Sequence, residues 1–224
     1  MHVGAHSMIL AIKDLSHRFG NHPVLRDFNL QLDRGEHTLL LGPSGSGKTT
    51  LINAITGLIT PNAGTIAVDG ETMNQLAPAG RDKLRRHKIG IIFQSLRLVS
   101  ALSVRDNLRL AQRLALGKAD DQAIAALLDQ LGIAHRASAK PRALSQGEAQ
   151  RAAIARALIG KPALLIADEP TSALDDENAK RVARLLIETA DQNGSTLLIA
   201  THDARLKAFI PNSRSLTPNL VKAS

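Results

Sequence analysis

Residues 42–49, with the sequence GPSGSGKT, form a glycine-rich segment directly after the apolar residues 38–41. Glycines let backbone N–H groups crowd around a phosphate where a side chain would collide with it. Lys48 supplies a positive charge for the outer phosphates, and Thr49 supplies a hydroxyl for Mg²⁺. A helix that begins here directs its positive dipole end toward the anion. The segment is therefore predicted to bind a triphosphate.

A pair of acidic residues, Asp168 and Glu169, follows the apolar run at residues 164–167. We interpret the run as a buried parallel strand that delivers both carboxylates to the sheet edge carrying the phosphate loop. Asp168 suits a Mg²⁺ ion because magnesium prefers oxygen ligands, and Glu169 could polarise an attacking water. A helix-starting turn before Pro170 is the alternative, and these residues alone leave both interpretations open.

Ser145 and Glu148 match the S-x-x-E capping box at the start of an alanine-rich helical stretch that runs to Leu158. The simplest interpretation is a well-capped helix. Such an N-terminus, with the Ser145 hydroxyl and the Gly147 amide exposed, is also an anion site that can bind a phosphate presented by another molecule. The two interpretations do not exclude each other.

Five segments, taken together, resemble the nucleotide-binding subunit of ATP-binding cassette (ABC) transporters. In chain order they are residues 42–49, 144–148, 164–169 and 172–175, then His202. The resemblance covers roughly residues 9–206 and is specific because several motifs agree in order and spacing. Further segments are similar to the lipoprotein-releasing and macrolide-efflux ATPases: residues 88–94, Leu98, residues 102–104, Asn107 and Leu108.

The resemblance implies an ATPase that uses ATP and Mg²⁺, with a role for individual residues. Four residues would be catalytic: Lys48, Gln94, Glu169 and His202. Three would hold Mg²⁺: Thr49, Gln94 and Asp168. Phe19 would stack on adenine, and the loop would bind the phosphates through Gly42, Pro43, Ser44, Gly45, Ser46, Gly47, Lys48, Thr49 and Thr50. Without the resemblance, Gln94 is a surface residue after a strand, His202 a solvated loop residue, and Phe19 a core residue.

The resemblance also implies that two copies share each ATP. Ser145, Gln146, Gly147 and Glu148 would act on the nucleotide of the other copy, and Asp175 would lie in the loop that crosses to it. Asp175 is equally suited to cap the next helix. Gln146 and Glu148 depart from the usual Leu-Ser-Gly-Gly-Gln signature, and a side chain at Gln146 is expected to narrow the approach to a phosphate. Residues 207–215 lack the usual closing hairpin, so we expect a minimal or frayed C-terminus without a regulatory domain.

Composition agrees with a subunit that works beside a membrane without entering it. None of the 224 residues lies in an apolar run of the roughly 18 residues that a span needs, and no signal peptide is recognisable. The absence of cysteine excludes disulfides. The net charge of +8 permits peripheral contact with anionic lipid, but no aromatic platform supports nucleic-acid binding. We expect a cytoplasmic protein on the inner membrane face, a second copy of itself, and a membrane permease as partners.

The predicted fold class is α/β: a P-loop NTPase core with a mostly parallel sheet, an antiparallel β subdomain and an inserted helical subdomain. One domain over residues 1–224 would carry the helical lobe at about residues 95–160. The parallel strands are expected at residues 38–41, 89–93, 164–167 and 196–200, and the antiparallel strands at residues 8–12, 28–32 and 65–68. Ser103 and Asp120 are expected at helix starts. A soluble ABC ATPase without a permease, for iron–sulfur assembly or DNA work, is the alternative function.

Overall fold

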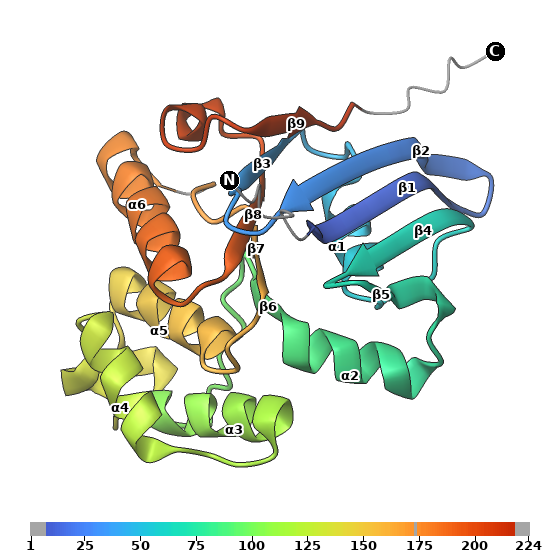
Figure 1. Ribbon diagram of the computed structural model, residues 1–224. Helices are drawn as coiled ribbons and strands as arrows, with labels where there is room; N and C mark the ends of the chain where they lie inside the picture. Colours follow the sequence, from blue (N-terminus) through green and yellow to red (C-terminus); the bar gives the residue numbers. More distant parts are fainter. Residues whose placement is uncertain (1–7, 173, 218–224) are drawn as a thin grey trace, which may run out of the picture.

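The computed structural model describes residues 8–172 and 174–217, and its centre is a parallel sheet (Figure 1). The strand order is β6-β7-β8-β3-β9, with every neighbouring pair parallel. The strands are β3 (Thr38–Leu41), β6 (Ile89–Ile92), β7 (Leu164–Asp168), β8 (Thr196–Thr201) and β9 (Ser213–Ser215). The four strands expected from their apolar runs are present with nearly the expected bounds, which confirms the parallel core.

Both faces of this sheet are covered, because alternate side chains of each strand point to opposite sides. On β7, Leu164 and Ile166 pack into a core with helix α1 (Lys48–Ile55) and the antiparallel sheet. Leu165 and Ala167 pack into a second core with α5 (Gln146–Leu158) and α6 (Asp176–Gln192). Figure 1 accordingly shows α5 and α6 on one side of the parallel sheet and α1 on the other.

The second sheet is antiparallel, with strand order β2-β1-β4-β5. Its strands are β1 (Met8–Phe19), β2 (His22–Asp33), β4 (Ala63–Val68) and β5 (Glu71–Thr72). The bounds expected for the first two strands were wrong, since each is 12 residues long. Register shifts interrupt the pairing of β1 with β2, and Asp14 and Asp27 have positive φ angles. These irregularities hide the two-residue alternation from which the strands were predicted.

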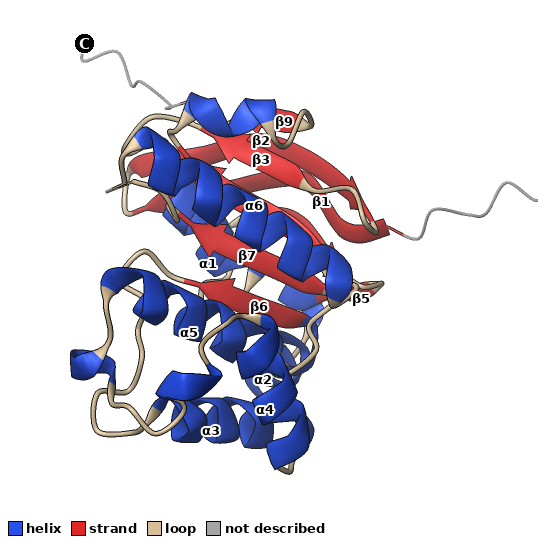
Figure 2. Ribbon diagram, turned by 90° about the vertical axis from the view of Figure 1, so that its left-hand side faces the viewer, coloured by secondary structure: helices blue, strands red, loops and turns tan. Residues whose placement is uncertain are grey.

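Three helices between β6 and β7 pack around one part of the second core: α3 (Val104–Leu116), α4 (Asp121–Gln130) and α5 (Figure 2). Ser103 caps α3, as expected from the sequence, and Asp120 caps α4, which was expected to begin there. The preceding helix α2 (Pro78–Lys88) buries only Leu84 and is basic elsewhere, so it presents a solvated face. Short 3-10 turns occupy Met73–Gln75, Ala134–Arg136, Pro141–Ala143 and Ala204–Ala208. Among the described helices, none has the length and apolar character to cross a membrane.

The C-terminal segment contains a strand that the sequence analysis did not predict. Ser213–Ser215 forms β9 and pairs in parallel with β3 at the edge of the sheet, and the Leu216 N–H donates to the Leu41 carbonyl at 2.7 Å. The chain is therefore hydrogen-bonded to the sheet up to Leu216, so the expectation of a frayed end is wrong for these residues. Any conclusion about residues 218–224 lies outside the described part of the chain.

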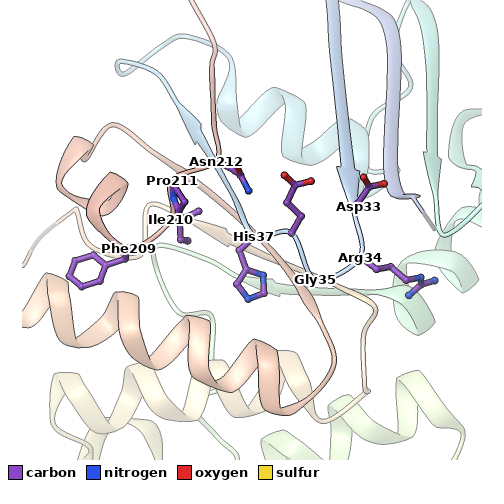
Figure 3. A pocket seen from close by; sticks show the side chains of 9 residues that line it. Asp33, Arg34, Gly35, His37, Phe209, Ile210, Pro211 and Asn212 are labelled. Atoms are coloured by element: carbon purple, nitrogen blue, oxygen red, sulfur yellow. The ribbon is translucent and has the colours of Figure 1, made fainter. Parts of the chain in front are cut away.

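A hollow of about 580 Å³ lies where β3 and β9 begin, at the sheet edge opposite the phosphate loop (Figure 3). His37 lines it and joins three elements. The Leu197 N–H of β8 donates to His37 Nδ1 at 3.1 Å, so the other ring nitrogen carries the proton. That nitrogen, Nε2, donates to Asp191 of α6 at 3.0 Å. The ring thus connects β8 and α6 to the residue before β3, so His37 and Asp191 have a structural role.

Replacing His37 with Phe should destabilise the protein, because the buried Leu197 N–H would lose its acceptor. The expected loss is about 1–3 kcal/mol in the free energy of unfolding, the usual cost of an unsatisfied buried polar group. Denaturant titration measures it. His37→Asn is the control, since its side-chain oxygen can lie near the position of Nδ1 and should recover part of the loss. Equal stability of His37→Phe and the unmodified protein would contradict this role.

Candidate functional site

The phosphate loop connects β3 to α1 and places Lys48 at the start of the helix. Gly47 is the helix N-cap, with a φ of 100°. A Cβ atom at Gly47 would lie 2.9 Å from Val24 Cγ1, so a larger residue would be both strained and crowded. Lys48 is 6% exposed, and its Nζ donates to the carbonyls of Gly42 at 2.7 Å and Pro43 at 3.1 Å. The loop therefore orients the lysine as well as exposing backbone N–H groups.

Glu169 leaves the end of β7 with an unusual backbone conformation. Its φ is +48°, in the left-handed region that costs a non-glycine residue about 1–3 kcal/mol. The Glu169 N–H donates to the Ala200 carbonyl of β8 at 2.8 Å, which holds the turn against the neighbouring strand. The strained turn directs the Glu169 carboxylate toward the phosphate loop, where it meets Lys48.

The Glu169 carboxylate is bound by three side chains from two other segments. Lys48 Nζ lies 3.2 Å from Oε1. The Thr201 hydroxyl donates to Oε2 at 3.0 Å, and His202 Nδ1 lies 3.0 Å from the same oxygen. Lys48 and His202 were both predicted to contact phosphate, and here both contact a carboxylate. The site therefore has the donors that an anionic oxygen needs, converging on one point.

The two adjacent carboxyl groups have pKa values displaced in opposite directions. Burial raises the pKa of Asp168, and the neighbouring charge of Glu169 raises it further, against opposing effects of Lys48 and Arg97. Burial also acts to raise the pKa of Glu169, but hydrogen bonds from His202, Lys48 and Thr201 outweigh it and hold that pKa below its usual value. Glu169 is thus kept ionised, while Asp168 lacks a comparable set of donors.

A pocket of about 410 Å³ brings nine of the predicted residues together. Its lining residues are Val24, Ser44, Gly45, Gly47, Lys48, Thr49, Thr50, Gln94, Asp168 and Glu169. Gln94 Nε2 donates to the Ser172 hydroxyl at 3.0 Å, and this hydroxyl donates to the Glu169 carbonyl at 3.2 Å. Gln94 is exposed, as the surface interpretation expects, and these hydrogen bonds also connect it to the turn that carries the carboxylate.

The oxygen donors predicted for Mg²⁺ fit that ion. Thr49, Gln94 and Asp168 line the same pocket, and a cation there would offset the unfavourable burial of the Asp168 charge. Within residues 8–172 and 174–217, no group of three or more His, Cys, Asp or Glu residues is arranged to hold a metal without help. Such an ion would take its remaining ligands from phosphate oxygens and water, as magnesium commonly does.

Ser145 to Glu148 lie at the start of α5, away from the lining of this pocket. Both bonds of the capping box are present: the Ser145 hydroxyl accepts from the Glu148 N–H, and the Glu148 carboxylate accepts from the Ser145 N–H. Together with Arg136, these contacts lower the pKa of Glu148 to about 2. Gln146 and Gly147 line a separate hollow of about 190 Å³ toward α6, and Gln146 shares that lining with Asn178.

Two predicted residues have clear structural positions of their own. Asp175 is the N-cap of α6, where its carboxylate accepts from the Asn178 N–H at 2.9 Å, so the capping interpretation is confirmed. Phe19 is 54% exposed at the end of β1, and the interpretation of it as a core residue is wrong. Its ring meets the ring of His17 edge to face, with centroids 4.7 Å apart and planes at 85°.

Some contacts at the site come from residues that were not predicted from the sequence. Thr201 binds the Glu169 carboxylate, and Ser172 binds Gln94. Thr201 ends β8 directly before His202, so the rule that parallel strands end at one edge could have identified it. The carbonyls of Gly42 and Pro43 bind Lys48, and no sequence pattern marks a backbone acceptor of this kind.

Comparison with known proteins gives consistent results. The sequence profile of the family described as ABC transporter matches residues 25–172. The chain is 38% identical over 204 residues to the lipoprotein-releasing system ATP-binding protein LolD of Shewanella denitrificans, covering 90% of this chain and 87% of LolD. It is 37% identical over 202 residues to the macrolide export ATP-binding/permease protein MacB of Campylobacter jejuni, covering 89% of this chain but 31% of MacB.

A solved structure with a similar fold is the dimeric, post-hydrolysis state of the ATP-binding cassette MJ0796 bound to ADP and Pi. Its TM-score is 0.82 at 30% sequence identity, and the match covers 94% of this chain and 96% of that one. The agreement therefore extends over both sheets and the helices, and it confirms the α/β P-loop class.

Replacing Glu169 with Gln should leave ATP binding intact and slow turnover by roughly 10²- to 10⁴-fold, the range usual for a positioned general base. The amide keeps the shape of the side chain but cannot accept the proton of the attacking water. Phosphate release at saturating ATP and calorimetric ATP binding are the two measurements. Glu188→Gln, on the exposed face of α6, is the control and should turn over normally. Turnover at the unmodified rate in Glu169→Gln would exclude Glu169 as the base.

Proposed function

The chain belongs to the ABC transporter family, and we propose that it hydrolyses ATP at two sites shared between two copies of itself. It is the ATP-hydrolysing subunit of a transporter, and a separate membrane permease is its partner. The observation that carries the proposal is the convergence of Lys48, Thr201 and His202 on the Glu169 carboxylate at the mouth of the phosphate loop.

ATP would bind along the antiparallel sheet and across the phosphate loop. Phe19, exposed at the hairpin end, would stack on adenine. The loop N–H groups and the start of α1 would hold the phosphates, with Lys48 as the fixed cation. Thr49, Gln94 and Asp168 would hold Mg²⁺, which would neutralise charge that develops on the phosphates.

The structure supports a simple account of how Glu169 becomes a base. Its pKa is held down by Lys48, Thr201 and His202. The phosphates of bound ATP would compete for Lys48 and His202. A carboxylate that loses a neighbouring cation has a higher pKa and accepts a proton more readily. Glu169 would then orient and deprotonate the attacking water, while Lys48 and the helix N-termini stabilise the transition state.

The second half of each site would come from the partner copy. The α5 N-terminus, with Ser145 and the Gly147 N–H, would provide an anion site on a separate part of the chain from Lys48. A γ-phosphate held by Lys48 of one copy would meet Ser145 of the other. Asp175, which caps α6, would lie in the loop that crosses between copies. ATP would close the dimer, and hydrolysis would release it.

The permease would dock on an apolar groove beside α3. The groove has a volume of about 220 Å³, and its lining includes Ile89, Ala111 and Leu114, with arginines at the rim. Leu114 is 54% exposed there, and Leu110 and Leu116 of the same helix are also exposed. Exposed apolar side chains of this density are typical of protein interaction sites. The groove adjoins Arg97, in the loop that begins at Gln94, through Arg156.

The similarity to LolD and MacB favours lipoprotein or lipid release, or efflux, as the work of the complete transporter. We place the subunit in the cytoplasm, on the inner face of the membrane, with peripheral membrane contact through the permease and the basic surface of α2. The net charge of +8 favours that contact. We do not assign nucleic acid as a partner, because an aromatic platform does not accompany the charge.

Replacing Leu114 with Asp should weaken recovery of the permease. The tagged protein should co-purify with a multi-span membrane protein from detergent extracts, and Leu114→Asp should reduce the yield at least several-fold while ATP binding persists. Leu58→Asp is the matched control, since Leu58 is also 54% exposed but lies outside the groove. A subunit that recovers no membrane protein would instead support an ATPase that works without a permease. Equal recovery with both variants would exclude this groove.

Mixing two inactive variants tests the shared site. Ser145→Ala and Lys48→Ala should each be inactive alone, because each removes one half of both sites. In the mixed dimer one site keeps an intact Lys48 and an intact Ser145, and the other lacks both. ATPase activity should therefore reappear on mixing, provided one intact site can turn over without the other. The rate for the unmodified protein should also rise faster than linearly with protein concentration below the dimerisation constant.

The matched control mixes Lys48→Ala with Glu169→Gln. Both changes affect the half-site that carries the phosphate loop, so neither site of the mixed dimer is complete and activity should not return. If Ser145 only caps its own helix, its replacement should cost about 1 kcal/mol of stability and leave turnover unchanged. A folded Ser145→Ala protein with normal turnover, and a rate proportional to concentration, would refute the shared site.

A further inference from the structure

His17 of β1 is a buried imidazole that the proposed mechanism does not use. The residue is 8% exposed, and neither ring nitrogen has a hydrogen-bond partner within the described part of the chain. Burying an unpaired polar group is unfavourable, and an apolar side chain of similar size would avoid the cost. The ring therefore acts on its neighbours through its aromatic edge and not through a hydrogen bond.

His17 contacts the exposed ring of Phe19 and is paired with the strand β2, which packs against the phosphate loop. On one side it meets Phe19 edge to face at 4.7 Å. Across the hairpin it pairs with Leu25. The position of a Cβ atom on Gly47 would be 3.2 Å from Leu25 Cδ2 and 2.9 Å from Val24 Cγ1, so this part of β2 packs directly against the loop. His17 is thus connected to Phe19 by a ring contact and to the loop residue Gly47 through its strand partner Leu25.

The backbone around His17 is irregular. The pairing of β1 with β2 shifts register between Leu15 and His17 and again between His17 and Arg18. Such shifts redirect side chains and are common beside active sites. Phe19 follows these shifts and pairs with His22 at the end of the ladder. Its side chain is 54% exposed, and the edge-to-face contact with His17 restricts the orientation of its ring.

We infer that His17 is a positioning residue for nucleotide binding. Its ring fixes Phe19 at a set position relative to the phosphate loop, so that stacking of adenine on Phe19 adds to the affinity for ATP. This inference rests on the proposed role of Phe19 as the adenine platform. An edge-to-face aromatic pair contributes about 0.5–1.5 kcal/mol beyond its buried area. At about 1.4 kcal/mol per tenfold, its loss corresponds to about a 2- to 12-fold weaker binding of ATP.

Replacing His17 with Leu separates this role from a structural one. The dissociation constant for ATP should rise about 2- to 12-fold, while that for inorganic tripolyphosphate, which has no base, should stay unchanged. In steady-state kinetics KM should rise and kcat should change little. His17→Phe keeps an aromatic edge against Phe19 and should restore ATP affinity. A residue with only a structural role would alter the melting temperature without changing the ratio of the two dissociation constants.

The same change made in a Phe19→Ala background should have no further effect on ATP affinity, since the ring that His17 positions is gone. Equal weakening of ATP and tripolyphosphate by His17→Leu would overturn the inference, and so would a full effect in the Phe19→Ala background. Lys48→Ala tests the proposed phosphate site independently of His17, because it removes the cation of that site. Loss of tripolyphosphate binding in that variant supports the phosphate site whatever His17→Leu does, and its retention would instead overturn the phosphate site itself.

Discussion

The site depends on one constraint, the parallel register of β3, β7 and β8. Leu41 lies opposite Thr201, and Asp168 lies opposite Ala200. The chain segments that leave these strands therefore start at the same edge of the sheet, although more than a hundred residues separate β3 from β7 and β8 in sequence. Side chains alternate between the two faces of a strand, so a shift of one residue in β7 would turn Asp168 and Glu169 each to the other face of the sheet. The contact between Lys48 and Glu169 exists only in the observed register.

That contact also explains the electrostatics of the site. Lys48 and Glu169 are both largely buried, and removing one member of a buried ion pair leaves the other charge uncompensated. An incoming phosphate would provide Lys48 with a replacement anion, whereas Glu169 would lose its cation, which raises the pKa of its carboxyl group. The positive φ of Glu169 keeps its carboxylate at the point of exchange. Backbone strain and charge pairing thus act together on one residue.

Local patterns explain which parts of the fold were predictable. The apolar runs of β3 and β8 and the capping residues Ser103, Asp120 and Ser145 determine structure within a few residues, and each was identified from sequence. The strand β9 has the sequence Ser-Arg-Ser, which carries no apolar signal and forms because β3 offers an open edge. The hairpin length was hidden by register shifts. Thr201 ends an apolar strand and could have been placed at the site by the rule that parallel strands end at one edge, whereas no sequence pattern marks the contact of Ser172 with Gln94.

The helix α5 links the parts of the site that the parallel sheet does not bring together. Its first turn carries the Ser145 capping box, and in its last turn Arg156 donates to the carbonyl of Arg97. Arg97 and its neighbour Leu96 both have positive φ angles, in the loop that begins at Gln94. Because 13 helical residues span about 20 Å as a stiff unit, a displacement of this loop would be transmitted to Gln94 and, through Arg156, to α5. A partner seated beside Arg156 would therefore act on the phosphate pocket and on Ser145 through the same contact.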